Sequence, residues 1–219
     1  MRVPKLIIFI LIGLLFGCSV DPASQGFIDA FNLNRGEDSS HSNSKLNPNF
    51  SYLRVQVGKR AVFMVLGYVD KDREGAVEVW YSALGEVIRL RDGRLVGATM
   101  NMGTDWLSVS FKQLPRWESI GAQTVFERDR DTSPGYKYGL QEKMHIRPIP
   151  EPNDSQIQLI QPASLTWFEE FSEGPDTLPA AHYAVSMAGI PLVVYAEQCL
   201  SNDFCFSWQR WTPKKESGH

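Results

Sequence analysis

The stretch from residue 76 to residue 111 constrains the fold most, because it alternates short apolar runs with turn sequences. The runs are Val77–Tyr81, Val87–Arg91, Leu95–Ala98 and Trp106–Phe111. Asp92-Gly93 joins two of them, and an Asp-Gly pair supplies the positive φ angles that a tight hairpin turn requires. Within Val87–Arg91 the two arginines alternate with Ile88 and Leu90, so one face of the strand is polar and the other apolar. This pattern predicts antiparallel strands in a half-buried sheet.

The composition favours one all-β domain. The chain has 219 residues, 43% hydrophobic and 21% charged, which is enough for one proper core. Its 13 prolines and 17 glycines are spread between short apolar runs, which favours many strands over long helices. Further strands are predicted at residues 52–57, 61–69, 124–130, 136–149, 156–160, 165–171, 182–187, 191–198 and 204–211.

The first 17 residues have the pattern of a lipoprotein signal peptide. Arg2 and Lys5 precede the apolar run Leu6–Phe16, and Cys18 follows shortly after it. The run is about half as long as the roughly 20 residues that a membrane-spanning helix needs. We therefore expect cleavage before Cys18 and lipidation of its thiol, with a plain secretory signal cut elsewhere as the alternative.

The lipid anchor predicts where the protein lies. Several acyl chains anchor a protein stably where one does not, and bacterial lipoproteins resemble three-chain cases. Ser19 follows the cysteine, whereas Asp at that position resembles an inner-membrane retention signal in bacterial lipoproteins. We therefore expect attachment to the outer membrane of a Gram-negative bacterium, with the body in the periplasm.

Charge and polarity define the remaining boundaries. Cleavage removes two of 22 basic residues and leaves 20 against 25 acidic ones, a net charge of −5, which argues against nucleic acid as a partner. The polar run Glu37–Ser44 cannot bury enough apolar surface to order itself. We predict a signal peptide at 1–17, a flexible tether at 18–46, a single antiparallel β domain at 47–213 and a disordered tail at 214–219.

Cys199 and Cys205 are positioned to form a disulfide. They flank a five-residue segment whose centre, Ser201–Asp203, is turn material, so the two sulfurs can face each other at a hairpin end. In an oxidising compartment such a pair is expected to be bonded. Free buried thiols and metal ligation are the alternatives, but zinc would require more Cys or His nearby.

Residues suited to acid–base catalysis form only weak constellations. The two candidate groups are Glu169, Glu170 and Glu173 near His182, and Asp105 beside a tryptophan. Adjacent residues point to opposite faces of a strand, so a solvated strand edge explains Glu169 and Glu170 more simply. The chain has no phosphate loop, no dinucleotide fingerprint and no metal spacing of histidines, so we expect no cofactor and no metal site.

Six tryptophans form a second pool of candidate residues. They are Trp80, Trp106, Trp117, Trp167, Trp208 and Trp211. Exposed indoles stack on the apolar faces of sugars, although large aromatic side chains more often pack in strands and interiors. We name Trp117, in a Pro-Arg-Trp-Glu connection, as the one expected to face solvent, and Trp106 as a second possible glycan contact.

Several segments together carry a family pattern. They are Leu53–Gly58, the hairpins from Val79–Ser82 to Asp92–Leu95, Thr99–Trp106, and the C-terminal segment from Glu197-Gln198 to Ser207–Trp211. In these segments the chain resembles the YjbF/GfcB family of lipoproteins, which is found with exopolysaccharide and group 4 capsule genes. The sequence departs from the family at Asn101, where Gly is frequent, and at His182-Tyr183, where the family has an Asn-Arg-Tyr-Trp pattern.

The resemblance implies a fold and a function. The expected fold is an all-β antiparallel meander that forms an open, incomplete β-barrel or a sandwich. The expected function is a non-enzymatic accessory role in exopolysaccharide or capsule export or assembly, with no catalytic residues to carry over. The expected partners are the membrane, through the anchor on Cys18, proteins of the secretion machinery, and the polysaccharide itself. The alternatives are a polysaccharide-modifying enzyme and a glycan-binding module that uses exposed tryptophans.

Overall fold

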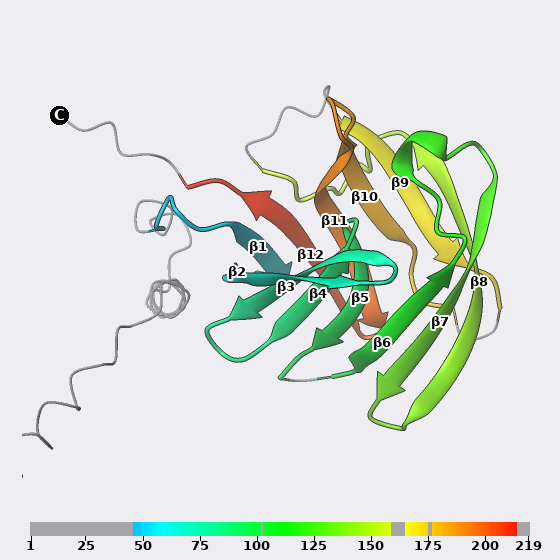
Figure 1. The fold of residues 1–219 in the computed structure, drawn as a ribbon, viewed down its shortest axis with the longest axis horizontal. Coiled ribbons are helices and arrows are strands. Elements are labelled where there is room, and N and C mark those ends of the chain that lie inside the picture. Colours follow the sequence, from blue (N-terminus) through cyan, green and yellow to red (C-terminus); the bar gives the residue numbers. More distant parts are fainter. Residues whose placement is uncertain (1–45, 102, 159–164, 175–176, 214–219) are drawn as a thin grey trace, which may run out of the picture.

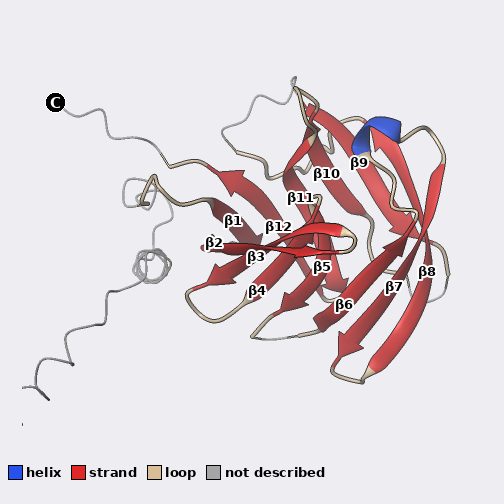
Figure 2. Cartoon of the chain, viewed as in Figure 1, coloured by secondary structure: helices blue, strands red, loops and turns tan. Residues whose placement is uncertain are grey.

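The computed structural model describes residues 46–101, 103–158, 165–174 and 177–213. The predicted signal peptide with Cys18, the tether as far as residue 45, and the tail at 214–219 lie outside the described residues. The strands are β1 (Tyr52–Val57), β2 (Arg60–Asp72), β3 (Gly75–Ser82), β4 (Val87–Arg91), β5 (Arg94–Thr99), β6 (Asp105–Lys112), β7 (Thr124–Ser133), β8 (Lys137–Ile149), β9 (Leu165–Ser172), β10 (Ala181–Ser186), β11 (Leu192–Ser201) and β12 (Phe204–Trp211) (Figure 1). Between β6 and β7 lies a short 3₁₀ turn, η2 (Trp117–Ser119) (Figure 2).

Each strand pairs antiparallel with the next in sequence, which confirms the predicted all-β meander. The last strand then pairs with the first, with Leu53 opposite Arg210 and Val55 opposite Trp208, so the barrel is closed. The prediction of an open, incomplete barrel or a sandwich is therefore wrong in this respect. Because the barrel is closed, neither β1 nor β12 has an unpaired edge. The unpaired backbone groups of an edge strand can pair with another chain and promote aggregation.

The β4–β5 hairpin has the turn that its sequence predicts. Asp92 and Gly93 have φ angles of 49° and 75°, as a tight two-residue turn requires. A Cβ at position 93 would lie 2.3 Å from Cβ of Val193 on β11, so the turn lies directly against the opposite side of the barrel. Glycine at this position therefore permits both the turn and its close packing.

The main core fills the barrel. A single cluster of buried apolar side chains receives at least one residue from every strand, including Leu53, Trp80, Ile88, Tyr183 and Trp208. Two smaller clusters lie outside it. One packs Leu46 against the outer face of β1 and β2, and the other packs Ile157 against Trp167.

The segment between β8 and β9 covers the second outer cluster. A strand was predicted at 156–160, but its described part, residues 156–158, lies outside the sheet. The Gln156 backbone N–H donates to the Tyr195 hydroxyl at 3.0 Å, and the Gln158 N–H donates to Gln209 Oε1 at 2.9 Å. Side chains of β11 and β12 thus satisfy backbone groups that strand pairing would otherwise satisfy.

Candidate functional site

Five charged side chains meet inside the barrel. We call Arg94, Arg128, Arg130, Glu142 and Glu170 the arginine–glutamate cluster. Arg94 Nε lies 3.1 Å from Glu170 Oε2, Arg128 Nε lies 2.7 Å from Glu142 Oε2, and Arg130 Nη2 lies 2.9 Å from Glu142 Oε1. Arg94 and Glu170 are 1% and 3% exposed, so the pair they form is a fully buried one.

Strand pairing explains how the cluster assembles. Arg128 of β7 lies opposite Glu142 of β8, so the two side chains share the interior face. Glu170 of β9 follows Phe168 by two residues and therefore shares its face, which packs in the main core. Arg94 begins β5 immediately after the β4–β5 turn and reaches Glu170 from a strand that is not its neighbour in the sheet.

Aromatic rings surround the Arg94 guanidinium. Its carbon lies 3.8 Å from the centroid of the Trp117 ring, and the Trp117 indole N–H donates to the Asp92 carbonyl at 3.1 Å. The Tyr183 hydroxyl donates to Glu170 Oε1 at 3.4 Å, and burial raises the pKa of this phenol well above its usual value. Trp117 is 2% exposed. The prediction that it faces solvent is therefore wrong, because η2 turns its ring into the mouth of the barrel.

The cluster is suited to structure rather than to proton transfer. Burial alone would raise the pKa of Glu142, but hydrogen bonds from Arg128 and Arg130 outweigh it and hold the pKa below its usual range. A general acid at neutral pH needs the opposite shift. The adjoining cavity, lined by residues that include Tyr183 and Gln198, encloses about 20 Å³. That is room for about one water molecule and not for a sugar.

The carboxylates proposed for catalysis do not converge. Glu169 and Glu170 lie on opposite faces as predicted. The solvated-edge interpretation is wrong for both, because Glu170 is buried and β9 pairs with both β8 and β10, so the partly exposed Glu169 lies on the outer face and not at an edge. Glu169 pairs with Arg147 at 2.7 Å, and Glu173 pairs with His145 at 2.9 Å. Asp105, on β6, accepts the Met100 backbone N–H at 2.8 Å.

His182 has a partner that the sequence did not suggest. Its Nδ1 lies 3.3 Å from Glu197 Oε2, and its Nε2 lies 3.8 Å from Glu169 Oε1. The hydrogen bond to Glu197 raises the pKa of His182, against the opposing effect of burial. The His182 side chain lies on the outer face of β10, so the sheet separates it from Glu170 in the interior.

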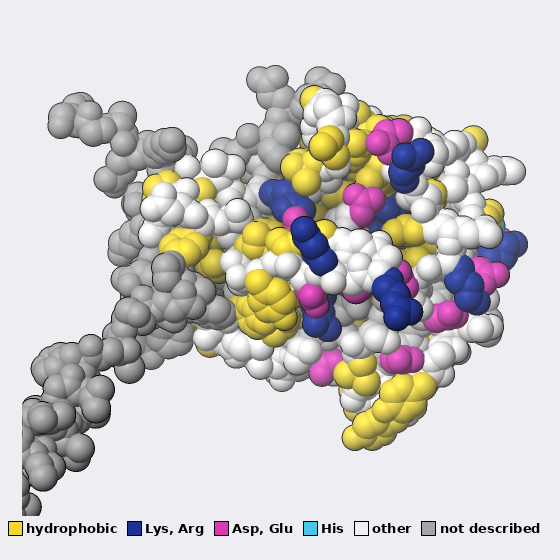
Figure 3. Space-filling view, in the orientation of Figure 1, with side chains coloured by type: hydrophobic (Ala, Val, Ile, Leu, Met, Phe, Trp, Pro, Cys, Tyr) yellow, Lys and Arg dark blue, Asp and Glu magenta, His cyan; other side chains and the backbone are white. Residues whose placement is uncertain are grey.

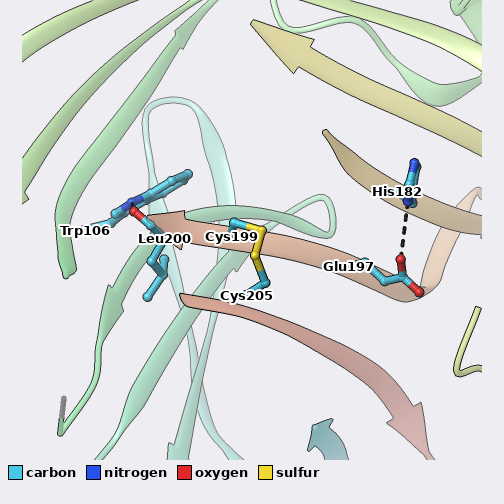
Figure 4. The surroundings of a disulfide bond; sticks show 6 residues. All are labelled: Trp106, His182, Glu197, Cys199, Leu200 and Cys205. Carbon is cyan, nitrogen blue, oxygen red and sulfur yellow. Dashed lines mark hydrogen bonds and ion pairs between the residues drawn. A yellow bond between two sulfur atoms is a disulfide. The ribbon is translucent and has the colours of Figure 1, made fainter. Parts of the chain in front are cut away.

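The predicted disulfide is confirmed. Cys199 of β11 and Cys205 of β12 lie directly opposite each other, and their sulfurs are bonded at 2.03 Å (Figure 4). The indole N–H of Trp106 donates to the Leu200 carbonyl at 3.0 Å, beside the bond. Trp106 is 4% exposed, so its ring is a packing element at this end of the barrel and is not available for a glycan contact.

Sequence reasoning missed the three arginines of the cluster and Glu142. A signal was present in Glu127–Arg130, the last four positions of a predicted strand, each of which carries a charge. Because strand residues alternate between faces, some of these charges had to point inward. Within the described part of the chain, no group of three or more Cys, His, Asp or Glu side chains is placed to hold a metal ion, and no helix has the length and apolarity to cross a membrane.

Comparisons with known proteins agree with this architecture. The family model for the group 4 capsule polysaccharide lipoprotein GfcB, YjbF, matches residues 33–179. The structure is similar to the crystal structure of the hypothetical lipoprotein YmcC from Escherichia coli (K12), with a TM-score of 0.58 and 14% sequence identity over 89% of this chain and 97% of that one. No curated protein matches the chain. The structural likeness, at this identity, shows a shared fold.

Proposed function

The chain belongs to the group 4 capsule polysaccharide lipoprotein family, and from this membership we propose that it is a non-enzymatic accessory factor in capsule or exopolysaccharide export or assembly. It acts from the outer membrane, to which a lipid on Cys18 attaches it. Its partners are proteins of the secretion machinery. The folded domain lies on the periplasmic side of the outer membrane.

One observation carries the non-enzymatic part of this proposal. The interior carboxylates Glu142 and Glu170 are each paired with arginines, and the cavity beside them has room for about one water. A hydrolase that acts on polysaccharide needs a carboxylic acid and a carboxylate on either side of the scissile bond. In the described residues the paired glutamates occupy the interior, while on the outer face Glu169 pairs with Arg147 and Glu173 pairs with Lys143.

The anchor can be tested first. We expect the unchanged protein to incorporate a fatty-acid probe and to fractionate with the outer membrane. Cys18→Ala should prevent both, because the thiol that accepts the lipid is gone. Fatty-acid labelling of the Cys18→Ala variant at the normal level would contradict the anchor.

The function is tested by deletion together with a turnover assay. We expect deletion of the gene to lower polymer on the cell surface, and the purified full chain in detergent to leave the length of that polymer unchanged. Sustained shortening that is abolished by Asp105→Asn, Glu169→Gln or Glu173→Gln would establish the enzyme alternative. Surface polymer that is normal in the deletion strain would refute the accessory role itself.

A further inference from the structure

A groove lies on the outer face of the barrel where β2, β3, β4 and β5 run side by side (Figure 1). Strand pairing places Tyr68 opposite Val79, Val79 opposite Arg89, and Arg89 opposite Gly97, so these four residues form one row across four strands. Tyr81, Val87 and Thr99 form the next row in the same way. The groove above them encloses about 180 Å³.

The groove exists because the sheet loosens beside it. β5 and β6 are joined through one residue pair in register, Ala98 with Trp106, whereas β4 and β5 share five. Leu107, the next residue of β6, lines the groove and is 44% exposed. The departure of β6 from β5 thus forms one wall, and the two rows of side chains form the floor.

Two glycines hold the principal side chains of the floor. A Cβ at Gly67 would lie 2.6 Å from Cε2 of Tyr81, so the Tyr81 ring packs over the backbone of β2 in the space that glycine leaves open. A Cβ at Gly97 would lie 3.1 Å from Cδ of Arg89, so the aliphatic part of Arg89 lies across the backbone of β5. The second ring, Tyr68, has its centroid 6.4 Å from that of Tyr81.

The groove combines a positive charge with aromatic surface. No Asp or Glu is among the residues that line it, and in the described ranges Arg89 forms no ion pair. Most other arginines of the barrel, such as Arg94 and Arg147, have a carboxylate partner within 4 Å. Arg89 is exposed on the solvent side of β4 and therefore presents its guanidinium to an incoming anion.

We propose that this groove binds one acidic sugar residue of the exported polysaccharide, with its carboxylate on Arg89 and the apolar face of its ring on Tyr81 and Tyr68. This inference rests on the proposed function, since it names the polymer chemistry that such an accessory factor would meet. A planar guanidinium matches a carboxylate through two parallel hydrogen bonds, and tyrosine offers a rigid apolar face beside a hydroxyl. Neighbouring sugars would run out of the groove, which is smaller than the roughly 300–1,000 Å³ of sites that enclose a whole ligand.

The barrel has a second set of exposed tyrosines that serves as a control. Tyr136 and Tyr138, at the β7–β8 hairpin, are 72% and 64% exposed. Figure 3 shows hydrophobic side chains projecting at the end of these strands. They lie on a protruding hairpin tip and not in the groove, so they offer aromatic surface without a concave site or the arginine.

The experiment uses the full chain in detergent and two matched probes. Oligogalacturonate supplies acidic sugar rings, and its fully methyl-esterified form has the same rings without the charge. Titration calorimetry should show saturable binding of the acid that weakens as salt increases, and binding of the ester that is at least tenfold weaker. No binding of the acid, or equal binding of both probes, would overturn the proposal.

Variants assign the effect to the groove. Arg89→Gln should weaken binding of the acid by about tenfold or more, and Arg89→Lys by less, because a point charge remains without the planar fork. Tyr81→Leu should weaken binding of acid and ester alike, and Tyr136→Leu should change neither. Thermal unfolding of each variant separates loss of binding from loss of folding. Binding by a folded Arg89→Gln protein at the unchanged affinity would refute the site.

The two proposals fail in different ways. If deletion of the gene lowers surface polymer but the groove binds no acid, the inference about the ligand is wrong and the accessory function stands. If deletion leaves surface polymer unchanged, the accessory function is wrong whatever the groove binds. Introducing Arg89→Gln on the chromosome tests the two proposals together. Surface polymer is reduced in that strain only if the protein assists export and the groove takes part in that role.

Discussion

Replacing Glu170 with alanine should destabilise the barrel far more than the same change at Glu169, one residue earlier. Glu170 is 3% exposed and is the ion-pair partner of Arg94, which is 1% exposed. Without it the Arg94 guanidinium keeps its charge inside the barrel, where the Trp117 ring lies 3.8 Å from its carbon and the remaining carboxylate is that of Asp92, 3.7 Å from Arg94 Nη1 and 45% exposed. A charge that stays buried without its buried partner is costly, because water does not solvate it and a half-exposed carboxylate compensates it only weakly.

The size of the effect follows from burial. Breaking a buried ion pair by removing one partner costs about 3–5 kcal/mol. A change of 1 kcal/mol shifts Tm by about 2–4 °C for a domain of 150–250 residues, so Glu170→Ala should lower Tm by about 6–20 °C. Glu169 pairs with Arg147, whose side chain is 54% exposed, and pairs of this kind contribute about 0–1 kcal/mol. Glu169→Ala should therefore lower Tm by no more than about 4 °C.

The measurement is thermal and guanidinium unfolding of the full chain, with the disulfide intact, followed by circular dichroism. The matched pair of variants controls for the loss of a glutamate and for strand propensity, since both residues lie on β9. Equal losses in the two variants would refute the reasoning. The result would also bear on closure, because Arg94 and Glu170 come from strands that are not neighbours and meet only across the interior.

Two further predictions concern β10, β11 and β12. Replacing Cys199 and Cys205 together with serine should cost about 2 kcal/mol, near the low end of the usual range because only six positions separate the cysteines; a loss well above 4 kcal/mol in guanidinium unfolding would contradict a purely local effect. His182 has a pKa raised by its hydrogen bond to Glu197. Its contribution to stability should therefore be complete below its unfolded pKa of about 6.5 and disappear as pH rises through its folded pKa. The difference in Tm between the unchanged protein and His182→Gln should shrink between pH 6 and pH 9, and a difference that grows with pH would show that the sign is wrong.

The parts of the fold that the sequence predicted are local. Apolar and polar residues alternate within each strand. The Asp92-Gly93 turn depends on two adjacent residues, and the Cys199–Cys205 bond joins the two strands of one hairpin. Each depends on contacts within about ten residues. A single sequence contains that information because backbone geometry alone decides which side chains meet.

The parts that the sequence did not predict depend on distant partners. Closure requires β1 to pair with β12, about 150 positions away, and neither strand shows by itself which edge it will meet. Trp117 lies in a Pro-Arg-Trp-Glu connection, which suggested that it faces solvent, but its ring centroid lies 5.3 Å from that of Phe168 and 5.2 Å from that of Tyr183. The location of Arg94 depends in the same way on Glu170, 76 positions later.

The arginine–glutamate cluster raises a question that a replacement by apolar residues can answer. A buried ion pair gives little net stability compared with apolar side chains of similar volume, because desolvation offsets the attraction. If the pair serves mainly to hold the β4–β5 turn against β9 in one register, the double variant Arg94→Met, Glu170→Leu should keep or increase Tm, by the equivalent of about 0–4 kcal/mol. The side chains of the interior would then be held in a less unique arrangement. Amide exchange near Asp92 and Trp117 should therefore accelerate relative to the rest of the barrel. A double variant as unstable as Glu170→Ala would show instead that the pair itself stabilises the barrel, since the apolar pair leaves no unpartnered charge.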